Sequence, residues 1–114
     1  MYLPIIATVI VLWGIIMPVS VTSAPDINTY AYTYTASGVC NIVTDSGLFP
    51  NLSESGQVSI LLHEYGHCLG LGHYGSCNYN ESIMGCATLG YVTDYDRAML
   101  RIKVRGYVAG VASD

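Results

Sequence analysis

A run of sequence reading HEYGHCLGLGH begins at His63, ends at His73 and contains all three histidines of the chain. Apolar side chains recur every three or four positions before and within it, which predicts an α-helix from Ser55 to Leu69. In such a helix His63 and His67 project from the same face, because four residues complete about one turn. Gly70 favours the left-handed conformation that ends a helix, so the chain can turn and bring His73 toward the other two imidazoles.

Three histidine nitrogens that converge in this way match the ligand set of a catalytic zinc ion, whose fourth position stays open to water. Glu64 lies at the flank of the same face, where its carboxylate can contact a metal-activated water and not the metal. The sequence therefore predicts a Zn²⁺ site with His63, His67 and His73 as ligands and Glu64 as the general base.

The segment resembles the extended HExxHxxGxxH signature of the metzincin zinc endopeptidases. The five fixed positions of that signature are occupied by His63, Glu64, His67, Gly70 and His73. The sequence SIMG at residues 82–85 is similar to the Met-turn that follows the third ligand in this family, with Met84 as its methionine. The resemblance covers the second half of the chain and is closest to small matrixin-like or snapalysin-like members.

The resemblance implies an α+β fold in which a small, reduced sheet packs on the active-site helix. An irregular Met-turn segment and a C-terminal helix would follow, and capping by Thr93 or Asp94 predicts that helix from Asp94 to Lys103. It further implies that the substrate is a peptide or protein, which adds in extended form to an edge strand above the zinc. We expect Val39–Thr44 to be that edge strand.

Two strands are predicted ahead of the active-site helix. Residues Asn28–Thr35 alternate aromatic and small side chains, which predicts a half-buried strand with Tyr30, Tyr32 and Tyr34 on one face. Residues Val39–Thr44 form the second, bounded by turn-forming residues on both sides. The family has four or five strands and a backing helix here, so the chain is a minimal member, a truncated gene product, or a fold that includes residues 1–24.

The first 25 residues carry no charged side chain, and residues 5–17 form an apolar run followed by small residues up to Ala24. This pattern predicts a secretory signal over residues 1–24, cleaved after Ala24, which leaves 25–114 as the peptidase domain. Two alternatives are an uncleaved membrane anchor over Leu3–Val21 and a helix or strand of the fold itself.

The four cysteines fit two disulfides if the chain is exported to an oxidising compartment. Three connectivities are open. Cys77 and Cys86 bracket one loop and could close it, which would leave Cys40 for Cys68. The chain has no CxxC pair, so a cysteine zinc site is disfavoured.

The formal net charge is −4, and the four basic residues all lie between Arg97 and Arg105. Such a chain cannot build the basic surface that nucleic acids require, so no nucleic-acid partner is expected. A membrane partner is expected only if the N-terminal segment is an anchor. We expect a secreted zinc metalloendopeptidase; the alternative is a catalytically silent, zinc-stabilised binding or structural module.

Overall fold

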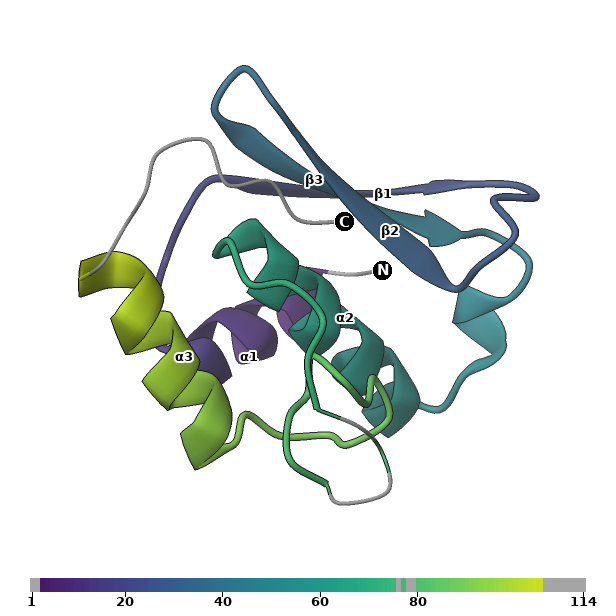
Figure 1. The fold of residues 1–114 in the computed structure, drawn as a ribbon. Helices are drawn as coiled ribbons and strands as arrows, with labels where there is room; N and C mark the ends of the chain where they lie inside the picture. Colours follow the sequence, from purple (N-terminus) through teal and green to yellow (C-terminus); the bar gives the residue numbers. More distant parts are fainter. Residues whose placement is uncertain (1–2, 76, 78–79, 106–114) are drawn as a thin grey trace.

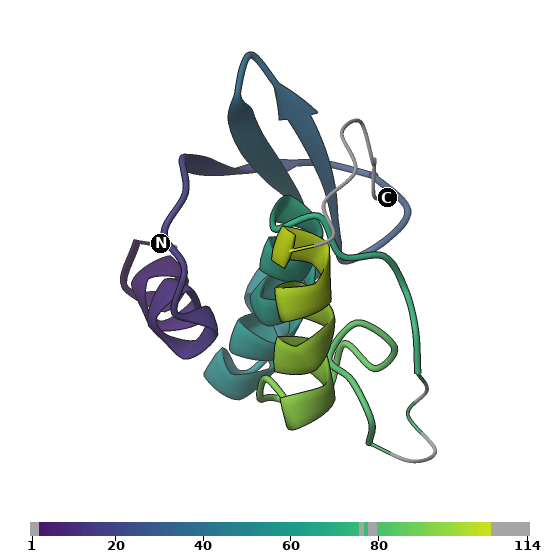
Figure 2. The same ribbon diagram turned by 60° about the vertical axis from the view of Figure 1, so that its left-hand side comes forward.

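The structure, a computed structural model, describes residues 3–75, 77 and 80–105. Over these residues the elements are α1 (Leu3–Trp13), β1 (Val19–Ala24), β2 (Ala31–Ala36), β3 (Val39–Asp45), a 3₁₀ turn (Phe49–Asn51), α2 (Glu54–Cys68) and α3 (Asp94–Arg105). The sheet forms one layer and the helices lie beneath it, with α2 packed directly against β2 and β3 (Figure 1; Figure 2). The expected α+β class, with a small sheet packed on the central helix, is confirmed.

In the described part of the chain the sheet has three strands in the order β1-β3-β2. Strand β3 pairs in parallel with β1, from Val19↔Cys40 to Ala24↔Asp45, and antiparallel with β2. The expectation that Val39–Thr44 is an edge strand is therefore wrong. It assumed two strands, but residues 19–24 add a third on the far side of β3, which becomes the buried centre of the sheet.

Strand β2 forms a hairpin with β3 through Ser37 and Gly38, whose φ angles of 54° and 77° are those of a tight two-residue turn. Tyr30, which directly precedes the strand, and Tyr32 and Tyr34 within it are 43–48% exposed. The intervening Ala31 and Thr33 are covered by the helix layer. The strand begins at Ala31 and not at the predicted Asn28, whose φ of 69° is left-handed. It is half-buried as expected, and its aromatic face is the one in contact with solvent.

The N-terminal segment is integrated into this fold as α1 and β1. The core includes Ile5, Ile6, Val9 and Trp13 from α1. The indole Nε1–H of Trp13 donates to the backbone oxygen of Leu62 in α2 at 2.9 Å. This matches the alternative in which residues 1–24 belong to the fold, while cleavage after Ala24 stays a prediction.

No helix in the described ranges combines the length and the apolar character that a bilayer crossing requires.

Helix α2 runs from Glu54 to Cys68, one residue from the predicted bounds at each end. Ser53 caps it, since its hydroxyl accepts from the backbone N–H of Gly56 at 3.1 Å. Gly70, with φ of 95°, takes the left-handed conformation just after the helix. Because α1 covers one side of α2 and the sheet another, both its apolar stripe and its histidine face contain buried residues.

Helix α3 runs from Asp94 to Arg105, and the backbone N–H of Asp96 donates to the Thr93 hydroxyl at 3.0 Å. Arg97 reaches across to α1, where its guanidinium donates to the backbone oxygen of Leu12 at 2.7 Å. Such a cation at a helix C-terminus satisfies carbonyls that have no partner within the helix. Helix α3 therefore stabilises the C-terminal end of α1 through this hydrogen bond.

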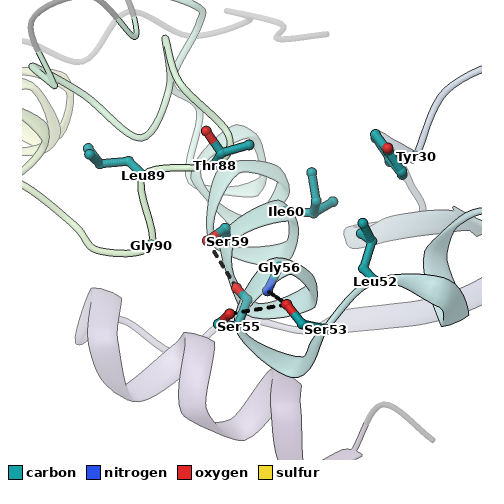
Figure 3. A pocket seen from close by; sticks show the side chains of 10 residues that line it. All are labelled: Tyr30, Leu52, Ser53, Ser55, Gly56, Ser59, Ile60, Thr88, Leu89 and Gly90. Carbon is teal, nitrogen blue, oxygen red and sulfur yellow. Dashed lines mark hydrogen bonds between the residues drawn. The ribbon is translucent and has the colours of Figure 1, made fainter.

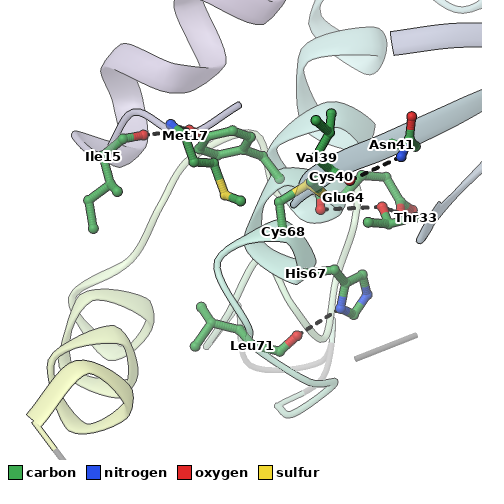
Figure 4. Close-up of a disulfide and its surroundings, with 11 residues drawn as sticks. Ile15, Met17, Thr33, Val39, Cys40, Asn41, Glu64, His67, Cys68 and Leu71 are labelled. Carbon is green, nitrogen blue, oxygen red and sulfur yellow. Dashed lines mark hydrogen bonds between the residues drawn. A yellow bond between two sulfur atoms is a disulfide. The ribbon is translucent and has the colours of Figure 1, made fainter. Parts of the chain in front are cut away.

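All four cysteines form disulfides, Cys40–Cys68 and Cys77–Cys86, which is the pairing the loop argument suggested. The first joins the start of β3 to the last residue of α2 (Figure 4). The second ties the segment after His73 to the segment after Met84. Two disulfides in a small chain fit an extracellular protein.

Candidate metal centre

The three histidines predicted as ligands converge. Their Nε2 atoms lie 3.2 Å apart for His63 and His67, 3.1 Å for His67 and His73, and 3.3 Å for His63 and His73. His67 is buried, His63 is half-buried and His73 is exposed, so the group opens to solvent on the side of His73. Among the described residues, this cluster could hold a metal ion.

Backbone carbonyls fix the tautomers of the two helical histidines. The Nδ1–H of His63 donates to the oxygen of Ile83, and that of His67 donates to the oxygen of Leu71, each at 2.8 Å. A carbonyl oxygen only accepts, so in the neutral rings both Nε2 atoms present lone pairs to one another. Adjacent lone pairs repel unless a cation lies between them, so the arrangement favours a bound metal.

The turn after α2 positions two of the candidate ligands. The backbone N–H of Leu71 donates to the oxygen of Gly66 at 3.0 Å, which wraps the chain back over the end of the helix. This turn brings His73 to the other two rings and aims the Leu71 oxygen at His67. Because a left-handed residue is needed, Gly70 is suited to the position.

The predicted Met-turn passes beneath the helix at the histidines. Met84 is fully buried, and a side chain at Gly66 would clash with its sulfur. The same added Cβ would lie 3.0 Å from Cζ2 of Trp13. Gly66 therefore lets both Met84 and Trp13 approach α2 beside His67, and Met84 forms a hydrophobic floor there.

Asp96 anchors this turn, a role that the sequence did not reveal. Its carboxylate is fully buried and accepts from the hydroxyl of Ser82 at 2.5 Å and the backbone N–H of Ile83 at 3.0 Å. It also accepts from the backbone N–H of Thr93 at 2.9 Å. The Thr-x-x-Asp spacing indicates a helix cap, but only the fold shows that the cap also holds the carbonyl that orients His63.

Burial lowers the pKa of His63, although its bond to Ile83 and the charge of Asp96 act in the opposite direction. The neutral, ligand-competent form of this imidazole therefore persists to a lower pH than in a free histidine. A metal ligand must be deprotonated, so burial favours the form of His63 that can bind a metal.

Glu64, the predicted general base, is 7% exposed and lies under β2. The hydroxyl of Thr33 donates to its Oε1 at 2.5 Å (Figure 4). Burial raises the pKa of Glu64, and the Thr33 bond and the nearby His73 oppose that shift. A carboxylate with a raised pKa is a better proton acceptor near neutral pH than an exposed one.

A cavity of about 380 Å³ lies along α2, on the N-terminal side of the histidines (Figure 3). Ile60 and Gly56 line it from the same helical face that carries His63. Tyr30 closes it beside the start of β2, and Thr88–Gly90 close it from the segment after Met84. The cavity therefore lies on the same face of α2 as His63. Its lining is mainly apolar and includes several hydroxyl groups.

Comparison of the chain with protein-family models, with curated proteins and with solved structures found no match.

Proposed function

We propose that this protein is a zinc-dependent endopeptidase of the metzincin type. One observation carries the proposal: three histidine Nε2 atoms lie within 3.3 Å of one another, and the buried Glu64 lies on the same helix as His63 and His67. Helix, turn and Met-turn occur in the order that the HExxHxxGxxH resemblance implies. The three histidines fit a bound metal ion, and we assign the ion as zinc because its donors would be imidazole nitrogens.

Three arguments favour a catalytic zinc. Tetrahedral nitrogen ligands at about 2.0–2.1 Å from zinc are separated by about 3.3–3.4 Å, close to the distances found here. Neutral imidazoles are preferred zinc ligands, whereas magnesium and calcium prefer oxygen. A purely structural site usually brings a fourth cysteine or histidine, but all cysteines are in disulfides and the chain has no fourth histidine.

When bound, zinc supplies a Lewis acid for the peptide carbonyl and lowers the pKa of a water molecule toward about 7. His63, His67 and His73 would hold the ion. Glu64 accepts the proton of the attacking water and then donates it to the leaving amine. Its burial supports both steps, because a raised pKa brings the carboxylate closer to the pH at which it must accept and release a proton.

The substrate would be a peptide in extended form. With β3 at the centre of the sheet, β2 is the edge strand that packs on α2, and its outer edge can pair with a peptide backbone. The cavity beside Tyr30 and Ile60 would then take a substrate side chain. Its lining favours an apolar or small polar group, because it holds no charged residue.

Helix α1 and strand β1 support this proposal. The two strands predicted in residues 25–52 alone leave the sheet short for the family, whereas the structure adds a third strand and a helix that backs α2. The two disulfides support a secreted enzyme, since such bonds persist in oxidising compartments.

The decisive experiment measures zinc content and the cleavage of a peptide library, with and without a chelator. We expect one zinc per chain and cleavage that the chelator abolishes. Replacing Glu64 with glutamine should abolish cleavage while the zinc content and fold remain. His73→Ala should lose most of the zinc, because two histidines alone hold it weakly.

Glu81→Gln is the matched control, since Glu81 is exposed and lies outside the histidine cluster. It should cleave like the wild type. A protein that binds one zinc per chain but cleaves no peptide would be the silent, zinc-stabilised module. Cleavage that survives both chelation and Glu64→Gln would rule out the proposed mechanism.

A further inference from the structure

The strand above the candidate base carries one polar side chain directed at it. In β2, Ala31 is buried and Thr33 is half-buried, while the flanking Tyr32 and Tyr34 are exposed. Thr33 lies opposite Ile42 of β3, whose side chain is fully buried. The register of the hairpin therefore fixes the Thr33 hydroxyl on the inner face of the sheet, against α2.

That hydroxyl meets the carboxylate of Glu64 directly. Thr33 Oγ1 lies 2.5 Å from Oε1 of Glu64, and the carboxylate side chain points from α2 toward the strand (Figure 4). A threonine has a restricted χ1 torsion, so its hydroxyl is a stiffer donor than that of a residue with a longer side chain. Glutamate has several rotatable bonds, and a carboxylate buried without a donor is costly.

We infer that Thr33 is a positioning residue for Glu64: its hydroxyl holds Oε1 and thereby fixes the carboxylate in one orientation on the helix that carries His63 and His67. The inference rests on the proposed function, because it gives Glu64 the role of base. With Oε1 occupied by Thr33, Oε2 is the oxygen that accepts and releases the proton. A base held in one orientation loses less entropy at the moment of reaction than one free to rotate.

The inference extends the site beyond the HExxHxxGxxH motif, to a strand 31 positions earlier in the chain. It also places the proposed peptide-binding edge and the partner of the general base on the same strand. The strand whose inner face holds Glu64 is the same strand whose outer edge would pair with the peptide, so docking and proton transfer share one rigid element.

The test compares Thr33→Val, which keeps the shape and removes the hydroxyl, with Thr33→Ser, which keeps the hydroxyl. We expect Thr33→Val to lower kcat about ten-fold with KM and zinc content nearly unchanged, because a hydrogen bond to a charged group is lost. Thr33→Ser should restore most of the rate. Thr35→Val, on the same strand but exposed, is the control and should behave like the wild type.

A second readout needs no activity. In the metal-free protein, Thr33→Val should lower the urea midpoint of unfolding, yet leave it nearly unchanged when Glu64 is already alanine. Equal effects in both backgrounds would overturn the inference even if the wild type cleaves peptides, as would a Thr33→Val enzyme with unaltered kcat. Coupling between the two residues in a protein that cleaves nothing would instead refute the proposed function and leave the contact established.

Discussion

Replacing Trp13 with alanine tests whether the N-terminal helix is part of the folded domain. Trp13 is 1% exposed and donates its indole N–H to the oxygen of Leu62 at 2.9 Å. Its ring also approaches Gly66 in α2, between the two helical histidines. If residues 1–24 were a dispensable leader, this side chain would contribute nothing to the stability of the rest of the chain.

The expected loss follows from burial. A tryptophan buries roughly 150–250 Å², which at about 25 cal/mol per Å² corresponds to about 4–6 kcal/mol as an upper estimate. Measured tryptophan-to-alanine changes in cores are about 3–5 kcal/mol. The Leu62 oxygen keeps a helical position and so is not left without a partner, and we therefore expect a loss of about 4 kcal/mol. That is a large share of the roughly 5–15 kcal/mol that stabilises a domain.

The assay is equilibrium denaturation in urea with both disulfides intact and a chelator present, so that bound metal does not mask the change. Circular dichroism follows unfolding in all variants, since Trp13 is the single tryptophan of the chain. With a slope of about 1–3 kcal/mol per M, the midpoint should fall by at least about 1 M.

Val11→Ala is the matched control, because Val11 lies on the same helix and is 76% exposed. It should change the unfolding free energy by less than about 0.5 kcal/mol. Equal midpoints for Trp13→Ala and Val11→Ala would refute the packing of α1 on α2. Sequencing the N-terminus of the exported protein provides an independent check, since a folded, active product beginning at Pro25 would show that neither α1 nor β1 is required.

Three further outcomes are expected. Gly66→Ala should destabilise the protein by about 1–3 kcal/mol through its clash with Met84, and thermal unfolding measures this loss. Removing Cys40–Cys68 by a double alanine substitution should cost about 3–4 kcal/mol in urea, because the crosslink spans 28 positions; an unchanged midpoint would contradict this. Backbone N–H groups of Leu48, Gly47 and Ile27 lower the pKa of Asp45 below 3.8, so its stabilising effect is present above that pH and is lost as the pH falls through the depressed value. The stability difference between the wild type and Asp45→Asn should accordingly shrink in acid, and a difference independent of pH would count against it.

Features that depend on neighbours in the chain could be predicted from the sequence. The bounds of α2 and its two histidines follow from helical periodicity, and Gly70 marks the turn that carries His73. The two β-strands of the hairpin follow from alternation and from the Ser-Gly turn between them. The physical reason is that each of these depends on backbone conformation over a few residues, which the side chains of that segment largely set.

Contacts between distant segments could not be predicted in this way. An apolar run such as residues 5–17 indicates burial but not whether a bilayer, a translocation channel or a protein core provides it. The hydrogen bond between Trp13 and Leu62, 49 positions apart, shows that the protein core surrounds this apolar run. The position of β3 at the centre of the sheet depends on the same segment, because β1 supplies its second partner.

The candidate site also combines features set by the local sequence with contacts between distant segments. The three candidate ligands and Glu64 could be identified from one short motif, since four-residue spacing on a helix and one glycine turn suffice to bring the histidines together. Their hydrogen-bonding partners, Thr33 and the Ile83 carbonyl, come from β2 and from the segment 82–85, and Asp96 of α3 holds that segment. Only packing of these segments on α2 brings those hydrogen-bonding atoms within reach, because no local pattern specifies which distant donor or carbonyl will face a given side chain.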